Sequence, residues 1–418
     1  MENVSEKSGY YAALLFLVWP VLALASAFTN YRGSWGKNIL WAFVAFYGMV
    51  FAIGAESQES DIVGYVTEVK HLHSVELSMN EAFNYYRESG EIDIFRTLIA
   101  LVVSRVSSSQ TLLTLVYGLI FGFFFSRNIW FVLERLKGKV QPITLLLLAC
   151  FFLVVPFWFM NGFRFWTATH IFIYGLLPYL FEGKKSGAIV ASLAILMHFA
   201  FIVPVGILYG YMFLGDRLVL YFCFFIATFF ISQINLSVFN NIIENYAPKI
   251  VQERTSGYRS EEAVEEHREG GGKQTVWYVN YYLRAIDWSV RGFLVVLFLK
   301  GRRFFTKNKR WLSLFSFTLF FYGVATLLSS IPSGGRFITI VYLPALALIT
   351  LYVQNREHEV VMKRFILAAT PFLLLYIVVA VRIGLYSISS TAILGNPLIA
   401  MFLNGEHISL NDFMKSLL

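Results

Sequence analysis

Apolar runs of membrane-spanning length recur from one end of this chain to the other. Of its 418 residues, 57% are hydrophobic and only 14% are charged. A helix needs about 20 consecutive apolar residues to cross a bilayer core, and within lipid its backbone polar groups must be satisfied internally. The sequence therefore predicts an all-α polytopic membrane protein, with residues 1–418 forming a single integral membrane domain.

We expect about 12 transmembrane helices, two of which are short halves of one broken span. The first run lacks a small-residue cleavage site, so we expect it to be retained in the mature protein. The expected spans are 10–29, 38–55, 110–130, 142–160, 165–181, 186–200, 203–214, 218–235, 278–300, 311–330, 337–353 and 365–382.

Loops rich in Lys and Arg follow every second span, and such loops belong in the cytoplasm. This pattern predicts that both termini lie outside. It also accounts for the formal net charge of +8 without a nucleic-acid partner. Cys150 and Cys223 fall inside apolar runs, so we expect neither a disulfide framework nor a thiolate metal site.

Two segments do not fit simple spanning. Ile94–Val106 is short and carries two arginines, so we interpret it as an interfacial or re-entrant helix. Residues 186–214 are too long for one untilted span and are expected to break between His198 and Pro204. Because a broken helix is tolerated where it lines a cavity, we expect His198 to face that cavity.

Three segments are expected outside the membrane on the face opposite the basic loops. Residues 56–109 form an outer loop with the interfacial helix, residues 236–277 form a large outer loop, and residues 383–418 form an outer tail.

Arg164 and Arg336 each follow a polar turn at the outer boundary. Arg164 closes the turn that begins at Asn161, and Arg336 follows Gly335 in a turn rich in Ser, Pro and Gly. A guanidinium binds phosphate oxygens in a fork, and glycines let backbone approach an anion. The alternatives are an anchor that extends to lipid headgroups and a hairpin turn that only needs flexible residues.

His198 and Asp61 are the candidates for a general base. A histidine suits proton removal near neutral pH, and Asp61 follows the second span at the outer surface. The alternatives are a hydrogen-bonded structural histidine and a solvated loop acid.

A further charged face lies on the ninth span. Arg284, Asp287 and Arg291 are spaced i, i+3 and i+7, which places them on one side of a helix. Charges inside a membrane usually pair, so a self-neutralised network is the alternative to a ligand site. In either case we expect this face to point into the bundle. We expect no metal site, because His71 and His73 have no evident third ligand. Nucleotide-binding fingerprints are also absent from the sequence.

The order of these motifs resembles the EpsG-like branch of the Wzy-type polysaccharide polymerases. The resemblance covers the chain from about residue 40 onward and rests on the order in which these motifs occur. The family has Gln after the motif arginine, whereas this chain has Phe165. The matching motifs are Asp61-x-x-x-Tyr65, Asn161-Gly-Phe-Arg164, Met197-His198, Gly335-Arg336 and Gly395-Asn-Pro-Leu398.

The resemblance implies a membrane glycosyltransferase with a GT-C-like helical bundle in the bacterial cytoplasmic membrane. Such enzymes join oligosaccharide repeat units carried on undecaprenyl diphosphate at the outer face. Arg164 and Arg336 would hold the diphosphate, with Asn161, Tyr65 and Gly335 beside them. The expected partners are the lipid-linked oligosaccharide, membrane lipids, a chain-length regulator and a flippase of the same pathway, with no cofactor and no metal. The large outer loop would line the glycan entrance with Arg254, Tyr258 and Arg259.

The sequence is also compatible with three other functions. An O-antigen ligase or another lipid-linked-sugar glycosyltransferase would need similar arginines. A lipid-linked oligosaccharide flippase should carry charges at several membrane depths, whereas here the ionisable residues cluster at the outer boundary. A structural membrane subunit would leave the arginine turns unexplained.

Overall fold

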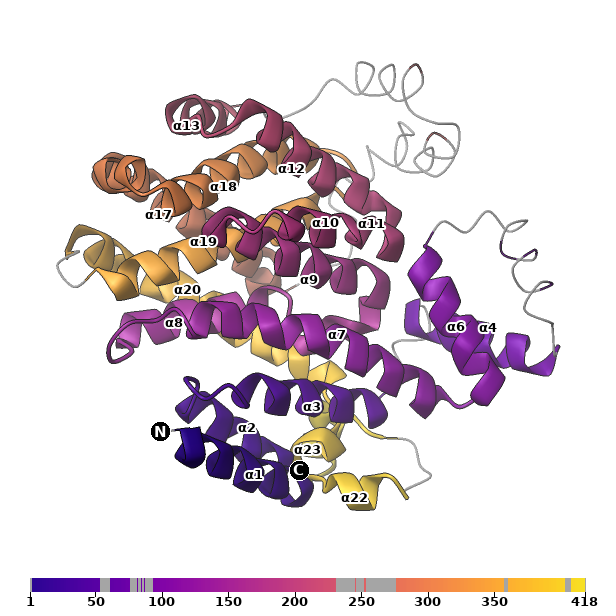
Figure 1. Cartoon of the computed structure of the whole chain (residues 1–418). Helices are drawn as coiled ribbons and strands as arrows, with labels where there is room; N and C mark the ends of the chain where they lie inside the picture. Colours follow the sequence, from indigo (N-terminus) through magenta and orange to yellow (C-terminus); the bar gives the residue numbers. More distant parts are fainter. Residues whose placement is uncertain are drawn as a thin grey trace.

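The computed structural model describes residues 2–52, 61–75, 81, 84, 86, 93–230, 245, 252, 276–356, 360–402 and 407–417. Within these residues every regular element is a helix and no strand forms (Figure 1). The helices are α1 (Glu2–Val18), α2 (Pro20–Thr29), α3 (Gly36–Met49), α4 (Asp61–Ser74), α6 (Ile94–Val106), α7 (Gln110–Leu133), α8 (Pro142–Val154), η2 (Phe157–Gly162), α9 (Phe163–Leu177), η3 (Pro178–Glu182), α10 (Ser186–Ser192), α11 (Ala194–Met197), η4 (Phe199–Phe201), α12 (Ile202–Leu214), α13 (Leu218–Ala227), α17 (Trp277–Lys307), α18 (Lys309–Leu328), α19 (Gly335–Asn355), α20 (Val360–Ser387), α21 (Ser390–Leu394), α22 (Pro397–Ala400) and α23 (Leu410–Ser416).

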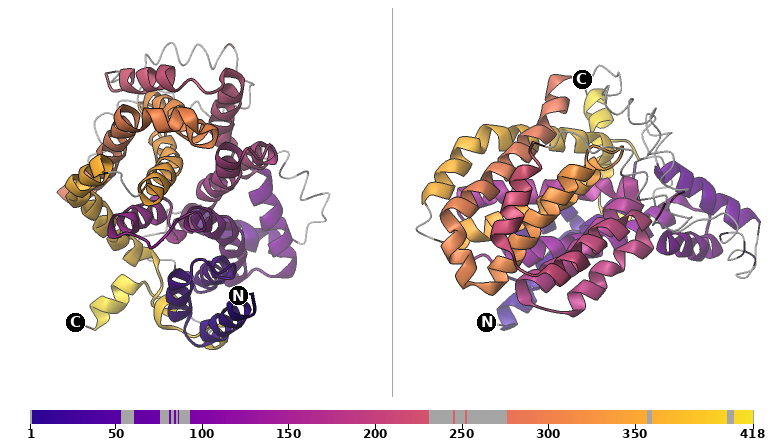
Figure 2. Two further views of the ribbon diagram at one scale, coloured as in Figure 1. Left: turned by 60° about the vertical axis from the view of Figure 1, so that its left-hand side comes forward. Right: turned by 90° about the horizontal axis from the view of Figure 1, so that it is seen from above.

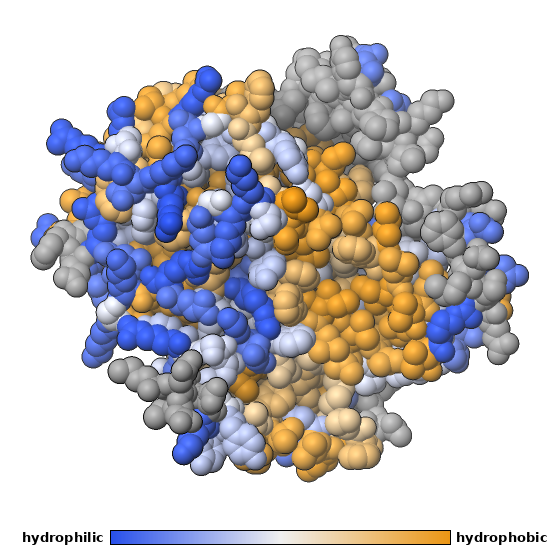
Figure 3. Space-filling view, viewed as in Figure 1, coloured by the Kyte–Doolittle hydropathy of each residue, from blue (hydrophilic) through white to orange (hydrophobic). Residues whose placement is uncertain are grey.

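Ion pairs connect several helix termini at one end of the bundle. We call this end the basic end. Lys37 at the start of α3 lies 3.3 Å from Glu134 after α7, and Arg135 pairs with Glu182 at the end of η3. Figure 3 shows hydrophilic residues on the side of the molecule where Figure 1 places the N-terminus, and a broad apolar surface beside them. We call the opposite end of the bundle the far end.

The long apolar helices run between these two ends. Five helical segments are long and apolar enough to cross a membrane: Gln110–Leu133, Pro142–Glu182, Lys309–Leu328, Gly335–Asn355 and Val360–Ser387. Shorter apolar helices fall in 20–29, 186–197, 199–214 and 218–227. The prediction of an all-α polytopic membrane fold is confirmed.

The second of these segments reverses at η2 and therefore contributes two passes. The Gln141 N–H donates to the Gln354 side chain at the basic end. Phe157 packs edge-on against Tyr47 at the far end, with ring centroids 4.9 Å apart. The segment then returns to the basic end, where Glu182 meets Arg135.

The first apolar run folds as a helical hairpin, so the prediction of one span over residues 10–29 is wrong. Trp19 precedes Pro20 and has an extended backbone, φ −151° and ψ 102°, because a residue before proline avoids the helical region. The indole N–H of Trp35 donates to the Ser8 hydroxyl at 3.1 Å. The N-terminal helix therefore starts at the basic end, not opposite the basic loops as expected.

Glycines allow α3 and α7 to approach closely. A Cβ on Gly118 would lie 2.7 Å from the Val44 carbonyl oxygen, and one on Gly48 would lie 2.3 Å from the Thr114 carbonyl oxygen. Small residues at such crossings let helix backbones pack directly in a membrane. The contact fixes α7, and α9 packs on α7 in turn.

A break inside the bundle is stabilised by a buried histidine. Helix α8 ends before Pro156, and the Phe159 N–H donates to the Pro156 carbonyl at 2.9 Å. A continuing helix would have given this N–H to the Val155 carbonyl, which is therefore left without a helical donor. His170 Nε2 lies 3.1 Å from that carbonyl oxygen, and His170 Nδ1 lies 3.2 Å from the Asn128 amide nitrogen. The two contacts assign the ring hydrogen to Nε2, so His170 and Asn128 satisfy non-helical backbone where water is absent.

The predicted break at His198 is confirmed. His198 has an extended backbone, φ −152° and ψ 119°, between α11 and η4. The Ser192 and Tyr209 hydroxyls lie 3.1 Å apart across the two halves, and Tyr211 donates to the Ser313 carbonyl at the basic end. The chain therefore turns back at His198, at the far end.

The remaining elements cover the far end. Helices α4 and α6 lie beyond the ends of the long helices (Figures 1 and 2), which agrees with an interfacial position for Ile94–Val106. The C-terminal segment follows α20 at the far end, because Tyr47 donates to the Ser387 carbonyl at 3.0 Å and Trp19 donates to the Ile393 carbonyl at 2.8 Å.

We expect His170→Leu to lower the thermal stability of the purified protein, because it leaves the Val155 carbonyl unsatisfied and removes one of the two acceptors of the Asn128 amide. An unsatisfied buried group costs about 1–3 kcal/mol. Asn128→Leu and the double variant complete a cycle in which the two losses should be less than additive. Melting temperatures in detergent provide the measurement. Fully additive losses would contradict the coupling of these side chains.

Candidate functional site

A salt bridge at the far end joins segments distant in sequence. Asp93 directly precedes α6, and Arg164 lies in the first turn of α9. Arg164 Nη1 donates to Asp93 Oδ2 at 3.0 Å, while Asp93 Oδ1 accepts the Phe199 backbone N–H at 3.0 Å. The Asp93 side chain is only 5% exposed. One carboxylate thus fixes α6, α9 and the segment after His198 together.

Tyr65 holds the Arg164 guanidinium from α4. Arg164 Nε donates to the Tyr65 hydroxyl oxygen at 2.7 Å. Burial raises the pKa of this hydroxyl, although the Arg164 charge acts in the opposite direction, so Tyr65 remains neutral. Among the described residues, Arg164 Nη2 has no hydrogen-bond partner and remains available to a ligand.

His198 belongs to the same cluster. Its ring lies edge-on against Phe165, with centroids 5.3 Å apart, and Asp93, Arg164, Arg336 and Asp61 are close enough to act on it electrostatically. Its Nδ1 accepts the Ala200 backbone N–H at 3.2 Å, so the hydrogen of the neutral ring lies on Nε2. This geometry makes His198 a hydrogen-bond donor toward a ligand rather than a ready proton acceptor.

Arg336 completes the cluster from the first turn of α19. Its guanidinium carbon lies 5.5 Å from the centre of the Phe165 ring. The side chain is exposed, and no carboxylate pairs with it in the described part of the chain. An unpaired arginine at the positive end of a helix is favourable for anion binding. Phe165 thus lies in contact with both Arg336 and His198.

The turn before Arg336 depends on one glycine. A Cβ on Gly334 would lie 1.9 Å from the Leu328 carbonyl oxygen, whereas a Cβ on Gly335 would meet nothing within 4 Å. Ser333 has a left-handed backbone, φ 64°. Gly334 is therefore needed for the turn itself, and Gly335 leaves open space at the start of α19.

Two other expected residues border the cluster. The Asn161 side-chain oxygen in η2 is buried without a hydrogen-bond partner among the described residues. Asp61 is exposed at the start of α4 and acts electrostatically on Arg164, Tyr65 and His198. Within the described residues, neither the Asn161 oxygen nor the Asp61 carboxylate has a hydrogen-bond partner that would keep it from a ligand.

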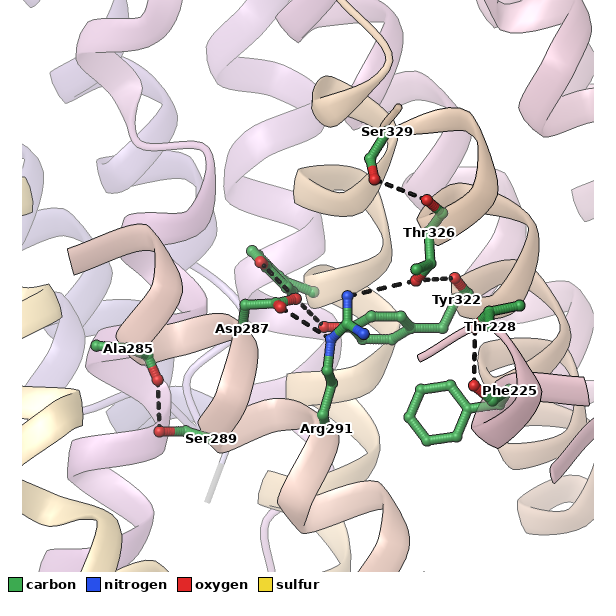
Figure 4. Close-up of polar contacts among 10 residues, drawn as sticks. Phe225, Thr228, Ala285, Asp287, Ser289, Arg291, Tyr322, Thr326 and Ser329 are labelled. Carbon is green, nitrogen blue, oxygen red and sulfur yellow. Dashed lines mark hydrogen bonds and ion pairs between the residues drawn. The ribbon is translucent and has the colours of Figure 1, made fainter. Parts of the chain in front are cut away.

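The charged face of the ninth span forms a separate network (Figure 4). Asp287 Oδ2 lies 2.8 Å from Arg291 Nε, and Asp287 Oδ1 accepts hydrogen bonds from Tyr322 at 2.5 Å and Tyr342 at 3.1 Å. Arg291 also donates to the Thr326 hydroxyl at 3.4 Å. The pair is neutralised and joins α17 to α18 and α19, which is a structural role.

Arg284 does not join this network. Its side chain is exposed, and its guanidinium carbon lies 5.5 Å from the centre of the Tyr281 ring. The expectation that all three charges point into the bundle is therefore wrong for Arg284. Arg254, Tyr258 and Arg259 lie outside the described residues.

Sequence patterns did not predict the role of Asp93 or the ion pair between buried Arg96 and half-buried Glu68. Arg96 pairs with Glu68, and its guanidinium carbon lies 5.3 Å from the Tyr65 ring centre. An Asp immediately before an apolar helix is a recognisable helix-start signal, but it does not disclose a partner at Arg164. No group of three or more His, Cys, Asp or Glu side chains that could hold a metal occurs among the described residues.

The comparisons with known proteins identify a family for most of the chain. The family model described as the EpsG family matches residues 38–390. No curated protein and no solved structure matches the chain. The matched region runs from the first turn of α3 to the end of α20. It therefore contains Arg164, His198, Arg336 and their neighbours Tyr65 and Asp93, which we call the arginine cluster.

We expect Asp93→Leu to lower the free energy of unfolding by about 2 kcal/mol, because it removes a charge-assisted hydrogen bond and leaves Arg164 unpaired. Asp412→Leu is the control, since Asp412 is an exposed acid of α23 whose nearest lysine nitrogen is 3.9 Å away. Thermal unfolding in detergent measures both. Equal effects would contradict the joining role of Asp93.

Proposed function

Because the chain belongs to the EpsG family, we propose that it is a polysaccharide polymerase acting on undecaprenyl-diphosphate-linked oligosaccharides. The observation that carries the proposal is the convergence of Arg164 and Arg336 on His198, with Phe165 in contact with His198 and Arg336. Three hydrogen-bond donors with positive or neutral charge suit a ligand that bears several anionic oxygens. The proposed enzyme is a membrane glycosyltransferase of Wzy type.

The proposed site faces the outside of the bacterial cytoplasmic membrane. Loops rich in Lys and Arg remain in the cytoplasm, so the basic end is assigned to the cytoplasmic side. The arginine cluster then opens on the outer face, where the C-terminal tail also lies. With this orientation we also propose a cytoplasmic N-terminus, because α1 starts at the basic end.

The reaction joins two lipid-linked chains. An acceptor sugar hydroxyl forms a bond to the anomeric carbon of the donor while the bond from that carbon to the diphosphate oxygen breaks. The hydroxyl proton passes to a base, and undecaprenyl diphosphate leaves with the bonding electron pair. No nucleotide is consumed, because the diphosphate ester already supplies the leaving group.

The arginines act on the leaving group. Arg164 is oriented by Tyr65 and Asp93 before substrate arrives, so its free Nη2 needs no reorganisation. Arg336 is unpaired among the described residues, and His198 offers Nε2–H. Donors that are already placed where charge develops usually supply the largest part of catalysis. Tyr65 and Asp93 are positioning residues in this scheme.

Asp61 is the better candidate for the base. Its carboxylate is exposed and close enough to influence Arg164 and His198, whereas Nδ1 of His198 already accepts a backbone N–H. Asn161, with an unsatisfied buried oxygen, is proposed to bind a sugar hydroxyl. Flippase and chain-length partners of the same pathway remain part of the proposal.

Reconstitution tests the function. Purified protein incubated with the lipid diphosphate-linked repeat unit of its own source should produce a ladder of multiples on a gel. Arg336→Ala should lower kcat by about 10²- to 10³-fold, as loss of one donor to a developing anion does. Arg382→Ala is the matched control, because this arginine lies over Tyr278 on another face.

Two other outcomes of this experiment would replace the proposed function, and a third would overturn the assigned site. A single product on a different acceptor would replace the polymerase with a ligase. An unaltered glycan that is moved across the bilayer would replace it with a flippase. Equal activity of the two arginine variants would overturn the assigned site.

The assignment of the base is tested separately. Asp61→Asn should lower kcat by about 10²- to 10⁴-fold, the usual contribution of a general base, whereas His198→Gln should keep proton removal and mainly weaken diphosphate binding. Single-turnover rates and KM for the donor distinguish these effects. A larger loss of kcat in His198→Gln than in Asp61→Asn would reverse the assignment.

A further inference from the structure

An apolar groove lies directly beneath the arginine cluster. Its volume is about 270 Å³. It is formed by helices α6, α7, α9, α10 and α11, and its walls carry hydrocarbon and aromatic side chains. The lining residues are Phe95, Leu98, Ile99, Ile120, Phe124, Ile171, Val190, Leu193 and Met197.

Three helices that line the groove also carry residues of the arginine cluster or their immediate neighbours. On α6, Phe95 follows Asp93 by two residues; on α11, Met197 immediately precedes His198. On α9, Ile171 lies seven residues after Arg164, on the same helix face and roughly 10 Å deeper. A molecule whose anionic head contacts the cluster therefore has an apolar path leading from that head.

The groove opens toward the surroundings of the bundle. Leu98 and Leu193 at its rim are 43% and 41% exposed, whereas Met197 and Ile171 at its floor are 1% and 3% exposed. Figure 3 shows apolar residues on the face of the molecule where Figure 1 places α10 and α11. This face would meet bilayer hydrocarbon, so a lipid chain could enter sideways without crossing water.

We infer that this groove holds the isoprene units nearest the diphosphate of a polyprenyl-linked substrate. The inference rests on the proposed function and adds the path of the lipid to it. Apolar contacts gain little over lipid tails in a bilayer, so the groove contributes placement of the diphosphate more than affinity. Its branched and aromatic walls suit a chain that carries a methyl group on every unit.

A larger groove elsewhere lacks these connections. It has a volume of about 700 Å³ between α17 and α20, with Trp277, Trp288 and Phe365 among its walls. Its arginine, Arg284, lies over Tyr281, and no residue of the arginine cluster borders it. Ordinary bilayer lipids are the occupants expected there, and the groove serves as an internal comparison.

Photo-crosslinking locates the lipid independently of turnover. The probe is a polyprenyl diphosphate that carries a diazirine near the diphosphate, incubated with the full-length protein in nanodiscs. Labelled peptides should map to α6 and α10–α11, and unlabelled undecaprenyl diphosphate should suppress the labelling. Labelling of α17 and α20, or labelling spread over all lipid-facing helices, would overturn the inference.

Variants that fill the groove provide the second test. Leu98→Trp and Leu193→Trp should lower kcat/KM roughly tenfold for an undecaprenyl-linked donor, the scale on which apolar pockets discriminate. They should leave kcat/KM unchanged for a donor whose diphosphate carries a methyl group in place of the prenyl chain. Leu367→Trp, at a 63% exposed position of α20, is the control. Equal effects on both donors would contradict the groove.

The two proposals can fail separately. Crosslinks in the groove without any glycan ladder would retain the lipid path and remove the polymerase. A ladder with crosslinks elsewhere would retain the polymerase and remove the lipid path.

Discussion

The salt bridge between Asp93 and Arg164 holds the far end of this protein together. A carboxylate that is almost wholly buried can remain there only if its oxygens are satisfied, and Asp93 meets this requirement with Arg164 and the Phe199 N–H. In doing so it fixes the start of α9, the start of α6 and the bend at His198 in one arrangement. Tyr65 occupies Arg164 Nε, so the guanidinium has little freedom left. The functional geometry is thus a consequence of charge burial.

The breaks in the helices are stabilised in the same way, because buried polar groups there also need hydrogen-bond partners. Non-helical backbone at membrane depth is tolerated only where protein groups satisfy it. At Val155 the partner is His170, deep in the bundle; at His198 the ring accepts the Ala200 N–H two residues later. The first histidine is committed to structure through both nitrogens, whereas the second keeps Nε2 free among the described residues. Two histidines on neighbouring segments therefore have different roles, and the number of free ring nitrogens decides which role each has.

Local patterns predicted much of this arrangement. Apolar run length predicted the all-α membrane fold, and the excessive length of residues 186–214 predicted the break at His198. The polar turns predicted Arg164 and Arg336 as anion-binding residues. The hairpin at Trp19 was missed because periodicity does not show that a chain reverses, although Pro20 marked the position. Asp93 was missed because its partners lie 71 and 106 residues away in sequence, and Arg284 was misplaced because helix spacing alone does not tell which neighbour a charge will find.

The most direct test of the account is an experimental structure with undecaprenyl diphosphate bound in a nanodisc. Diphosphate density is expected in contact with Arg164, Arg336 and the Nε2 side of His198, with the first isoprene units between α6 and α10–α11. Diphosphate density at the basic end, or lipid density only between α17 and α20, would contradict it.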